Sequence, residues 1–382
     1  MIPVMRTWLG KEEAEAAAEA VASGWIAQGP RVQEFEEAFA AAIGTPHAVA
    51  VSSCTAALHL ALIAAGIGPG DEVIVPSLSF IATANAVRYV GAQPVFADVD
   101  LATQNLIPKT VEPHLTGRTR AVILVDQAGV PADLDAMRAL CDPRQVTVIE
   151  DAACAAGSTY RARPVGVGAA LAAFSFHPRK LITTGEGGML TTWDGSIAAR
   201  VRRLREHGMD VSAADRHRSR QPVIEHYTEV GFNFRMTDVQ AAIGLVQLRK
   251  LAQMVARRRV LARRYQELLS GTPGLLTADD PPYGETNYQS FWMLLPEESA
   301  VSRDDLLRLL ADAGVSARRG IMAAHLEPPY ADAKPSLPVT LRLTERSLIL
   351  PLFHQMTQAQ QEHVASVVTS ALTNSTPAIS VP

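Results

Sequence analysis

The chain has 382 residues, of which 48% are hydrophobic and 19% are charged. Such a length exceeds a usual single core, so we expect one large domain and a smaller one. A formal net charge of −4 argues against bulk electrostatic binding of nucleic acid. The three cysteines form no CxxC pair, and the N-terminus has no apolar run of signal length. No stretch reaches the roughly 20 apolar residues that a membrane helix needs. We therefore expect a cytoplasmic protein.

The N-terminal segment predicts two helices, at 11–23 and 32–42. Gly24 follows the first helix in the position where a glycine usually ends one. The loop from Trp25 to Pro30 then places an aromatic and an amide side chain beside two backbone breakers.

From residue 47 onward, short apolar runs alternate with helical stretches. Near-continuous apolar strands separated by helices are typical of a mostly parallel sheet that is covered on both faces. In such α/β folds, ligands lie outside the carboxyl ends of the strands. The expected strands are 47–51, 72–75, 94–97, 121–125, 146–150 and 171–175, and the expected helices between them are 55–65, 81–90 and 131–140.

The second half of the chain predicts longer helices and a domain boundary. A strand at 189–192 is followed by helices at 195–207 and 238–269, and Thr237 is the expected N-cap of the second helix. The stretch 271–284 is rich in proline and glycine. We therefore assign 1–270 to a large cofactor-binding domain, 271–372 to a small domain with a strand at 288–295 and helices at 303–313 and 358–372, and 373–382 to a disordered tail.

Two arginine-rich stretches, 200–205 and 257–264, stand out against this background. Apolar residues interrupt both of them at helical spacing. The pattern favours solvated helix faces over anion-binding sites.

Lys180 directly follows an apolar strand and precedes the glycine-rich stretch 184–188. Most lysines are solvated surface charges. A lysine at the mouth of a sheet is different, because burial or neighbouring cations give it the depressed pKa that a Schiff-base nucleophile needs.

Polar groups at other strand ends complete a candidate site. Asp151 follows the strand at 146–150, where it is either an N-cap or a functional acid. The segment from Ser52 to Leu58 opens a helix, whose free N–H groups and positive dipole end suit a phosphate. Ser175 adds a hydroxyl, and Phe80, at a strand-to-helix junction, is either a core residue or a shelf for a ring.

Together these groups match the needs of pyridoxal 5′-phosphate (PLP). Its aldehyde forms a Schiff base with a lysine, and its ring is a strong electron sink only when an acid keeps the pyridine nitrogen protonated. Lys180 and Asp151 supply these two groups, and the helix start supplies a phosphate site.

From about Trp8 to Leu372 the chain resembles the DegT/DnrJ/EryC1/StrS family of sugar aminotransferases. The strongest segments are 24–30, 150–153, 174–188 and 231–238. The resemblance implies a fold-type-I, aspartate-aminotransferase-like α/β enzyme that binds PLP. It also implies a homodimer with active sites shared between the subunits.

The resemblance implies a role for individual residues. Lys180 is the expected Schiff-base lysine and Asp151 the acid at the pyridine nitrogen. Phosphate contacts are implied for Thr55, Ala56 and Ser175, ring stacking for Phe80, and contact with the neighbouring subunit's phosphate for Asn233. Substrate contacts are expected from Trp25, Ile26 and His325, and no metal is expected.

Two positions depart from the family pattern. Cys154 stands where relatives usually carry Gln or His against the ring hydroxyl of the cofactor, and a thiol is a weaker donor. Cys54 replaces a usual glycine and is expected to crowd the phosphate loop. Relatives with His at the lysine position are dehydratases, and Lys180 argues against that branch.

The reaction implied is a ping-pong transamination from an amino donor, L-glutamate in most relatives, to a keto-sugar. A nucleotide-linked keto-deoxysugar, aminated at C-3 or C-4 as in antibiotic or cell-surface glycan pathways, is the preferred substrate. A keto-cyclitol of the aminoglycoside type is the alternative. A non-catalytic PLP-binding regulator is disfavoured by Lys180 and Asp151, and no segment outside the fold is long enough to bind DNA.

Overall fold

The computed structural model describes residues 1–212, 216 and 221–373. Its centre is a seven-stranded sheet in the order β1-β9-β8-β5-β4-β2-β3. The sheet is parallel except for β9, which runs antiparallel to both of its neighbours. The strands are β1 (His47–Val51), β2 (Glu72–Pro76), β3 (Gln93–Ala97), β4 (Thr119–Val125), β5 (Thr147–Asp151), β8 (Leu171–Ser175) and β9 (Gly188–Thr192).

Both faces of this sheet are buried, which explains why its strands are apolar at nearly every position. Successive side chains in a strand point to opposite faces. In β1, accordingly, Val49 and Val51 belong to one core cluster, whereas Ala48 and Ala50 belong to the other. The mostly parallel α/β sheet predicted from the sequence is therefore confirmed.

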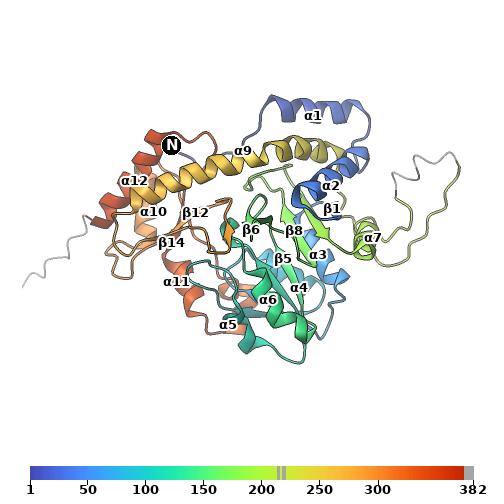
Figure 1. Cartoon of the computed structure of the whole chain (residues 1–382), viewed down its shortest axis with the longest axis horizontal. Helices are drawn as coiled ribbons and strands as arrows, with labels where there is room; N and C mark the ends of the chain where they lie inside the picture. The colour runs from blue at the N-terminus through green and yellow to red at the C-terminus, as the bar shows by residue number, and fades with distance from the viewer. Residues whose placement is uncertain (213–215, 217–220, 374–382) are drawn as a thin grey trace, which may run out of the picture.

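Helices cover the sheet on both sides (Figure 1). Residues of α3, α4 and α7 share one core cluster with the strands, and residues of α2, α6 and α9 share the other. The helices are α1 (Lys11–Ala22), α2 (Pro30–Ile43), α3 (Cys54–Ala64), α4 (Ala82–Tyr89), α5 (Pro108–Val111), α6 (Leu134–Cys141), α7 (Gly195–Leu204), α9 (Asp238–Leu269), α10 (Arg303–Asp312), α11 (Pro338–Arg346) and α12 (Gln358–Thr373).

Several predicted helix ends are found for the predicted reasons. Gly24, directly after α1, adopts a left-handed φ of 81°. Thr237 caps α9: its hydroxyl accepts from Gln240 N at 3.2 Å, and Gln240 Oε1 accepts from Thr237 N at 2.9 Å. The helix predicted at 131–140 begins later, at Leu134, because the Asp133 side chain caps it by accepting from Ala136 N.

A second, four-stranded sheet in the order β10-β12-β14-β13 is formed by the C-terminal part of the chain. Its strands are β10 (Leu276–Thr277), β12 (Phe291–Leu294), β13 (Arg318–Arg319) and β14 (Ser347–Leu350), so the strand predicted at 288–295 is shorter than expected. A small three-stranded sheet contains β6 (Thr159–Tyr160) and β7 (Arg163–Pro164), which lie between β5 and β8 in sequence, and β11 (Gly284–Glu285), which lies between β10 and β12.

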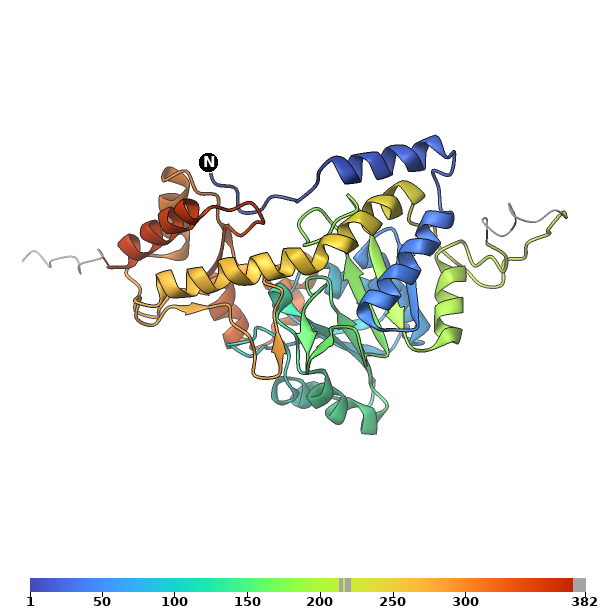
Figure 2. The same cartoon turned by 45° about the horizontal axis from the view of Figure 1, so that its top comes forward.

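The long helix α9 connects the two sheets in sequence and runs through the middle of the molecule in Figures 1 and 2. Helix α1 lies alongside it. The first residues of the chain run along the second sheet, since Ile2 N donates to Gly314 O at 2.7 Å and the Trp8 ring stacks on His354 at 3.7 Å. Among the described residues, no helix is both long and apolar enough to cross a membrane. The prediction for 374–382 falls outside the described residues.

The expectation of solvated arginine faces is wrong for two residues. Arg205 and Arg258 are each only 5% exposed. Arg205 forms a buried ion pair with Glu36, and Arg258 donates to the carbonyls of Tyr288, Gln289 and Leu352. Periodicity identified the helices correctly, but these guanidinium groups lie on their inner faces.

Candidate active site

Two predicted site residues meet at the carboxyl ends of neighbouring parallel strands. Asp151 ends β5 and Ser175 ends β8, and Asp151 pairs with Ala173 across the two strands. Both side chains lie on the sheet face that α3 and α4 cover, because Ile149 and Ala173 of the same strands belong to that core. They are 4% and 8% exposed, respectively.

Asp151 is held in place by groups that the sequence did not reveal. Thr83 of α4 donates its hydroxyl to Asp151 Oδ2 at 3.1 Å and lies 2.8 Å from the Ser79 hydroxyl. Ala153 N donates to Asp151 Oδ1 at 3.2 Å. Burial raises the pKa of Asp151, while the bonds from Ala153 and Thr83 and the nearby Lys180 amine act to lower it.

Lys180 faces this carboxylate from the turn after β8. Its Nζ donates to Cys154 Sγ at 3.0 Å. Burial acts to lower the pKa of Lys180, but Cys154, Cys54 and Asp151 outweigh it, so the pKa is raised. The depressed pKa expected from the sequence is therefore not found, because the amine lies among groups that favour its cation.

The backbone around Lys180 is fixed by Gln289, from the segment before β12. Gln289 Nε2 donates to Arg179 O at 2.6 Å, and Leu181 N donates to Gln289 Oε1 at 3.0 Å. A single amide therefore fixes both neighbours of the lysine. Asn287 similarly fixes the loop after β5, since its Nδ2 donates to Cys154 O at 2.8 Å.

Helix α9 supports this segment in turn. The buried Arg258 guanidinium donates to Tyr288 O at 2.7 Å and to Gln289 O at 2.8 Å, and burial lowers the pKa of Arg258 to about 10. Tyr288 has a left-handed φ of 49°, which is costly for a bulky residue. This strained turn and its arginine lie about 100 residues from Lys180 in sequence and form no recognisable motif with it.

The start of α3 has the geometry of a phosphate site, although phosphate binding there stays a prediction. Ser53 is the N-cap, and its hydroxyl accepts from Ala56 N at 3.1 Å. Strand β9 passes so close that a Cβ on Gly188 would lie 2.6 Å from Cys54 N. Thr55 and Cys54 are half-buried at the first turn, where the N–H groups and the helix dipole favour an anion.

Both departures from the family pattern lie in this group of residues. Cys154 contacts Lys180, and Cys54 is close enough to Asp151 and Lys180 for each to affect its thiol. Burial raises the pKa of Cys54 well above its ordinary value. Both thiols are free.

Phe80 lies between Ser79 and α4, beside the groups that hold Asp151. Its side chain is 70% exposed. An aromatic ring so open at this position is available to a planar ligand, and its role as a shelf stays a prediction.

Two further segments carry predicted site residues: the loop with Trp25 and Ile26, and the segment with Asn233. The Asp238 carboxylate at the start of α9 accepts from Gly29 N, at 2.8 Å, and from Val32 N, which fixes the loop carrying Trp25 and Ile26. Asn233 is exposed, and the next residue, Phe234, accepts from Ser52 N at 2.8 Å. Asn233 is therefore close to the phosphate loop of its own chain while its side chain is exposed.

His325 joins the small domain to the end of β2. Its Nδ1 lies 2.5 Å from Ser77 Oγ, and its backbone N–H donates to the same hydroxyl at 3.1 Å. The side chain is 6% exposed, and burial lowers its pKa. Substrate contact by His325 stays a prediction.

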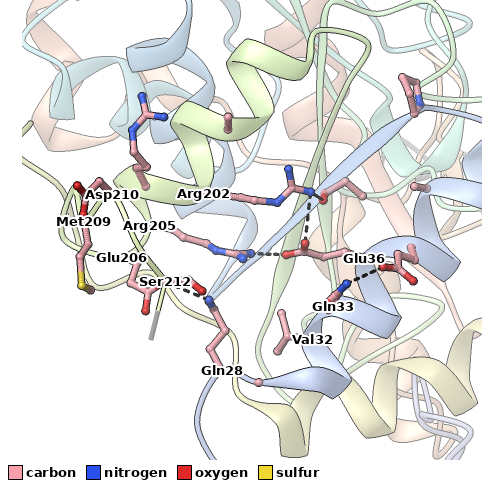
Figure 3. A pocket seen from close by; sticks show the side chains of 17 residues that line it. Gln28, Val32, Gln33, Glu36, Arg202, Arg205, Glu206, Met209, Asp210 and Ser212 are labelled. Carbon is pink, nitrogen blue, oxygen red and sulfur yellow. Dashed lines mark hydrogen bonds and ion pairs between the residues drawn. The ribbon is translucent and has the colours of Figure 1, made fainter. Parts of the chain in front are cut away.

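A cavity of about 570 Å³ lies between α2, α7 and the Gln28 loop, apart from these groups (Figure 3). Glu36 accepts from Arg205 and Arg202, and Gln28 Nε2 donates to Glu206 at 3.4 Å. The charges that line this cavity are thus largely paired with one another.

The residues at the strand ends fit PLP. A buried carboxylate suits the pyridinium N–H, the amine beside it suits a Schiff base, and the start of α3, kept open by Gly188, suits a phosphate. Fold and site together define a fold-type-I PLP enzyme.

Comparison with known proteins agrees with this class. The model of the DegT/DnrJ/EryC1/StrS aminotransferase family matches residues 8–369. The chain belongs to this family, and it is a PLP-dependent aminotransferase.

Solved structures resemble it over nearly their whole length. The aminotransferase TlmJ from Streptoalloteichus hindustanus is 38% identical, with 97% of this chain and 99% of that chain covered and a TM-score of 0.89. DesV from S. venezuelae, solved with a ketimine intermediate, is 36% identical, with coverages of 96% and 97% and a TM-score of 0.88. The PLP form of the putative sugar aminotransferase Spr1654 from Streptococcus pneumoniae is 26% identical, with coverages of 97% and 100% and a TM-score of 0.89.

Proposed function

We propose that this aminotransferase moves an amino group from L-glutamate to a nucleotide-linked keto-deoxysugar, with Lys180 and Asp151 as its catalytic residues. The observation that supports this most is the placement of the half-buried Lys180 amine and the buried Asp151 carboxylate at the carboxyl edge of one sheet, each close enough to shift the pKa of the other. Paired groups of this kind are concentrated at functional sites.

Bound PLP supplies an electron sink for the electrons of the broken C–H bond. With PLP bound, the Lys180 amine would take the proton from the α-carbon of the amino donor as a base and then give it up as an acid. Cys154 and the Gln289 bonds keep Nζ in one position for both transfers. Asp151 Oδ2, fixed by Thr83, holds the proton at the pyridine nitrogen.

A homodimer in the cytoplasm is part of this proposal. Exposed apolar side chains precede Asn233 in sequence, since Tyr227 is 62% and Val230 is 89% exposed. Large apolar side chains left open beside a polar contact residue are typical of an interface. A dimer that buries these side chains would present Asn233 to the phosphate site of the neighbouring subunit. The cytoplasmic location is proposed because three free thiols suit a reducing compartment.

The test is an absorbance spectrum of the PLP-loaded protein before and after L-glutamate. We expect a band at about 410–430 nm that L-glutamate converts to one near about 330 nm, as the cofactor's chemistry requires. The Lys180→Ala variant should not make this conversion. If the variant responds as the unchanged protein does, Lys180 is not the catalytic lysine.

The keto substrate is identified on the same sample. After conversion by L-glutamate, nucleotide-linked keto-sugars and nucleotide-free keto-cyclitols are added in turn. The compound that restores the long-wavelength band is the acceptor. Restoration by a keto-cyclitol alone would contradict the nucleotide-linked assignment.

A further inference from the structure

Cys154 and Lys180 bring two nucleophilic side chains into direct contact at the carboxyl edge of the sheet. Lys180 Nζ donates to Cys154 Sγ at 3.0 Å. Both residues are half-buried, and Cys154 is a free thiol. A small solute can therefore reach this pair, in contrast to the free thiol of Cys141, which is buried.

The loops that carry the two residues are both fixed by the segment before β12. Asn287 Nδ2 donates to Cys154 O at 2.8 Å, and a Cβ on Gly129 would lie 3.1 Å from the same carbonyl. On the other loop, Gln289 bonds to backbone groups on both sides of Lys180. The two backbones are thus held in place, and rotation within the long lysine side chain is enough to bring the nitrogen closer to the sulfur.

Cys54 is the other thiol near this amine, but its surroundings differ. It lies near enough to influence the charge of Lys180, whereas the hydrogen bond of Nζ goes to Cys154. Burial raises the pKa of Cys54 well above its ordinary value, which keeps this residue in the thiol form. Oxidants attack the thiolate form of cysteine, so the surroundings of Cys54 protect it from them.

We propose that Cys154 and Lys180 form an oxidation-sensitive pair, which a hydroperoxide joins through a covalent S–N bond whenever the lysine amine is free. The proposal rests on the proposed function, in which PLP occupies this amine until L-glutamate releases it. The S–N bond would prevent PLP from returning to Nζ, so oxidation would switch the enzyme off reversibly.

The reaction has two balanced steps. Cys154 Sγ first takes an OH group from the hydroperoxide as the O–O bond breaks, and the remainder leaves as an alcohol, or as water, with the thiol proton. The neutral Lys180 amine then attacks the sulfenic acid: an S–N bond forms, the S–O bond breaks, and the OH group leaves as water with an amine proton. The sulfur is oxidised and the peroxide is reduced, so no other reactant is needed. A dithiol reverses the reaction by attacking Sγ, releasing the amine and closing its own disulfide.

The experiment measures the intact mass of the PLP-loaded protein after treatment with hydrogen peroxide, with and without prior L-glutamate. After L-glutamate, we expect a loss of about 2 Da that dithiothreitol reverses and that peptide mapping assigns to a link between Cys154 and Lys180. Without L-glutamate the amine is not free to attack, so the loss should be slower by about tenfold or more.

Cysteine variants show which sulfur forms the bond. Cys54→Ala and Cys141→Ala are the matched controls, since each removes one thiol and leaves the pair intact, and both should still lose about 2 Da. Cys154→Ala should keep its mass. Lys180→Ala should stop at the sulfenic acid, a gain of about 16 Da that dimedone traps.

Three results would overturn the proposal. The first is a mass loss that disappears in Cys54→Ala, because the bond would then be a disulfide. The second is a gain of about 32 Da on Cys154 without a link to Lys180, because a sulfinic acid would then form instead. The third is an equal rate of mass loss before and after L-glutamate.

The absorbance band, recorded on the same samples, reports on the proposed function separately. If L-glutamate converts the band and no S–N bond forms, the oxidation-sensitive pair is overturned while the aminotransferase function stands. If L-glutamate leaves the band unchanged, the proposed function is contradicted instead.

Discussion

The seven-stranded sheet and the C-terminal part of the chain contribute to the candidate active site in different ways. The large domain supplies Asp151 and Ser175 from the ends of regular strands and Lys180 from the turn that follows. The C-terminal part of the chain supplies Gln289 from an irregular segment, and the side chain of this residue bonds to backbone groups on both sides of the lysine. The sheet thus determines the positions of the proposed reacting groups. Tertiary contacts alone bring in the residue that holds the lysine segment in place.

Replacing Asp151 by Asn tests the first half of this comparison and has the largest expected effect. The amide has the shape of the carboxylate but cannot balance a proton on the pyridine nitrogen, so the rate of the L-glutamate half-reaction should fall by about 10²- to 10⁴-fold. Stopped-flow spectroscopy measures this rate. Glu150→Gln is the control on the same strand, because the Glu150 side chain points to the opposite face of the sheet. A loss of rate below about tenfold in Asp151→Asn would contradict the role assigned to Asp151.

Replacing Gln289 by Ala tests the second half. Both bonds to the backbone beside Lys180 are lost, and a misplaced amine should lower kcat by about 10- to 100-fold while KM for L-glutamate changes little. The pH midpoint of the long-wavelength band should also move, because the surroundings of the Schiff base change.

Gln361→Ala provides the matched control for Gln289. Gln361 is a buried glutamine of α12 whose side-chain amide donates to Leu261 O at 2.8 Å, a backbone group of α9 and not of the lysine segment. Its variant should lose thermal stability without moving the midpoint of the band. If both variants leave the midpoint unchanged, Gln289 is structural only.

The smallest expected effect is on thermal stability and concerns Glu150, which lies next to Asp151 but has no role in the proposed reaction. Its Oε2 and Asp126 Oδ2 are buried without a hydrogen-bond partner among the described residues, and burial raises the pKa of Glu150 from 4.5 to about 7. A pKa raised on folding means that the folded state holds the proton more tightly. The stability from this group is present below about pH 4.5 and is lost as the pH rises through about 7.

The melting temperature of the unchanged protein should therefore fall between about pH 5 and about pH 8. Glu150→Gln, which is neutral throughout, should reduce this fall by about 1–3 °C in differential scanning fluorimetry. Part of the fall should remain in this variant, because burial also raises the pKa of Asp126. Identical pH profiles for the two proteins would contradict the burial argument.

The sequence predicted the sheet and the candidate residues at its carboxyl edge because both depend on local patterns. Apolar runs identified the strands, and the rule that ligands bind at carboxyl ends then selected Asp151, Ser175 and Lys180. The limits of α9 followed from the Thr237 cap and the helical period.

The groups that support the site could not be predicted in this way. Thr83 and Gln289 acquire their roles only when α4 and the small domain pack against the strand ends. The sequence predicted a lowered pKa for Lys180, whereas the structure raises it, because the contact with Cys154 is a tertiary one. Helical period places Arg258 on a face of α9 but does not reveal the carbonyls that it meets there.

The uninterrupted course of α9 has a consequence for inactivation by heat. Its 32 residues span about 48 Å as a single rod that begins at the Trp25 loop and ends in the small domain. Arg258, on this rod, holds the turn from which Gln289 reaches the backbone around Lys180. Local melting of the small domain would release that backbone even with the large sheet intact, so catalytic competence should be lost at the first, subglobal step of unfolding.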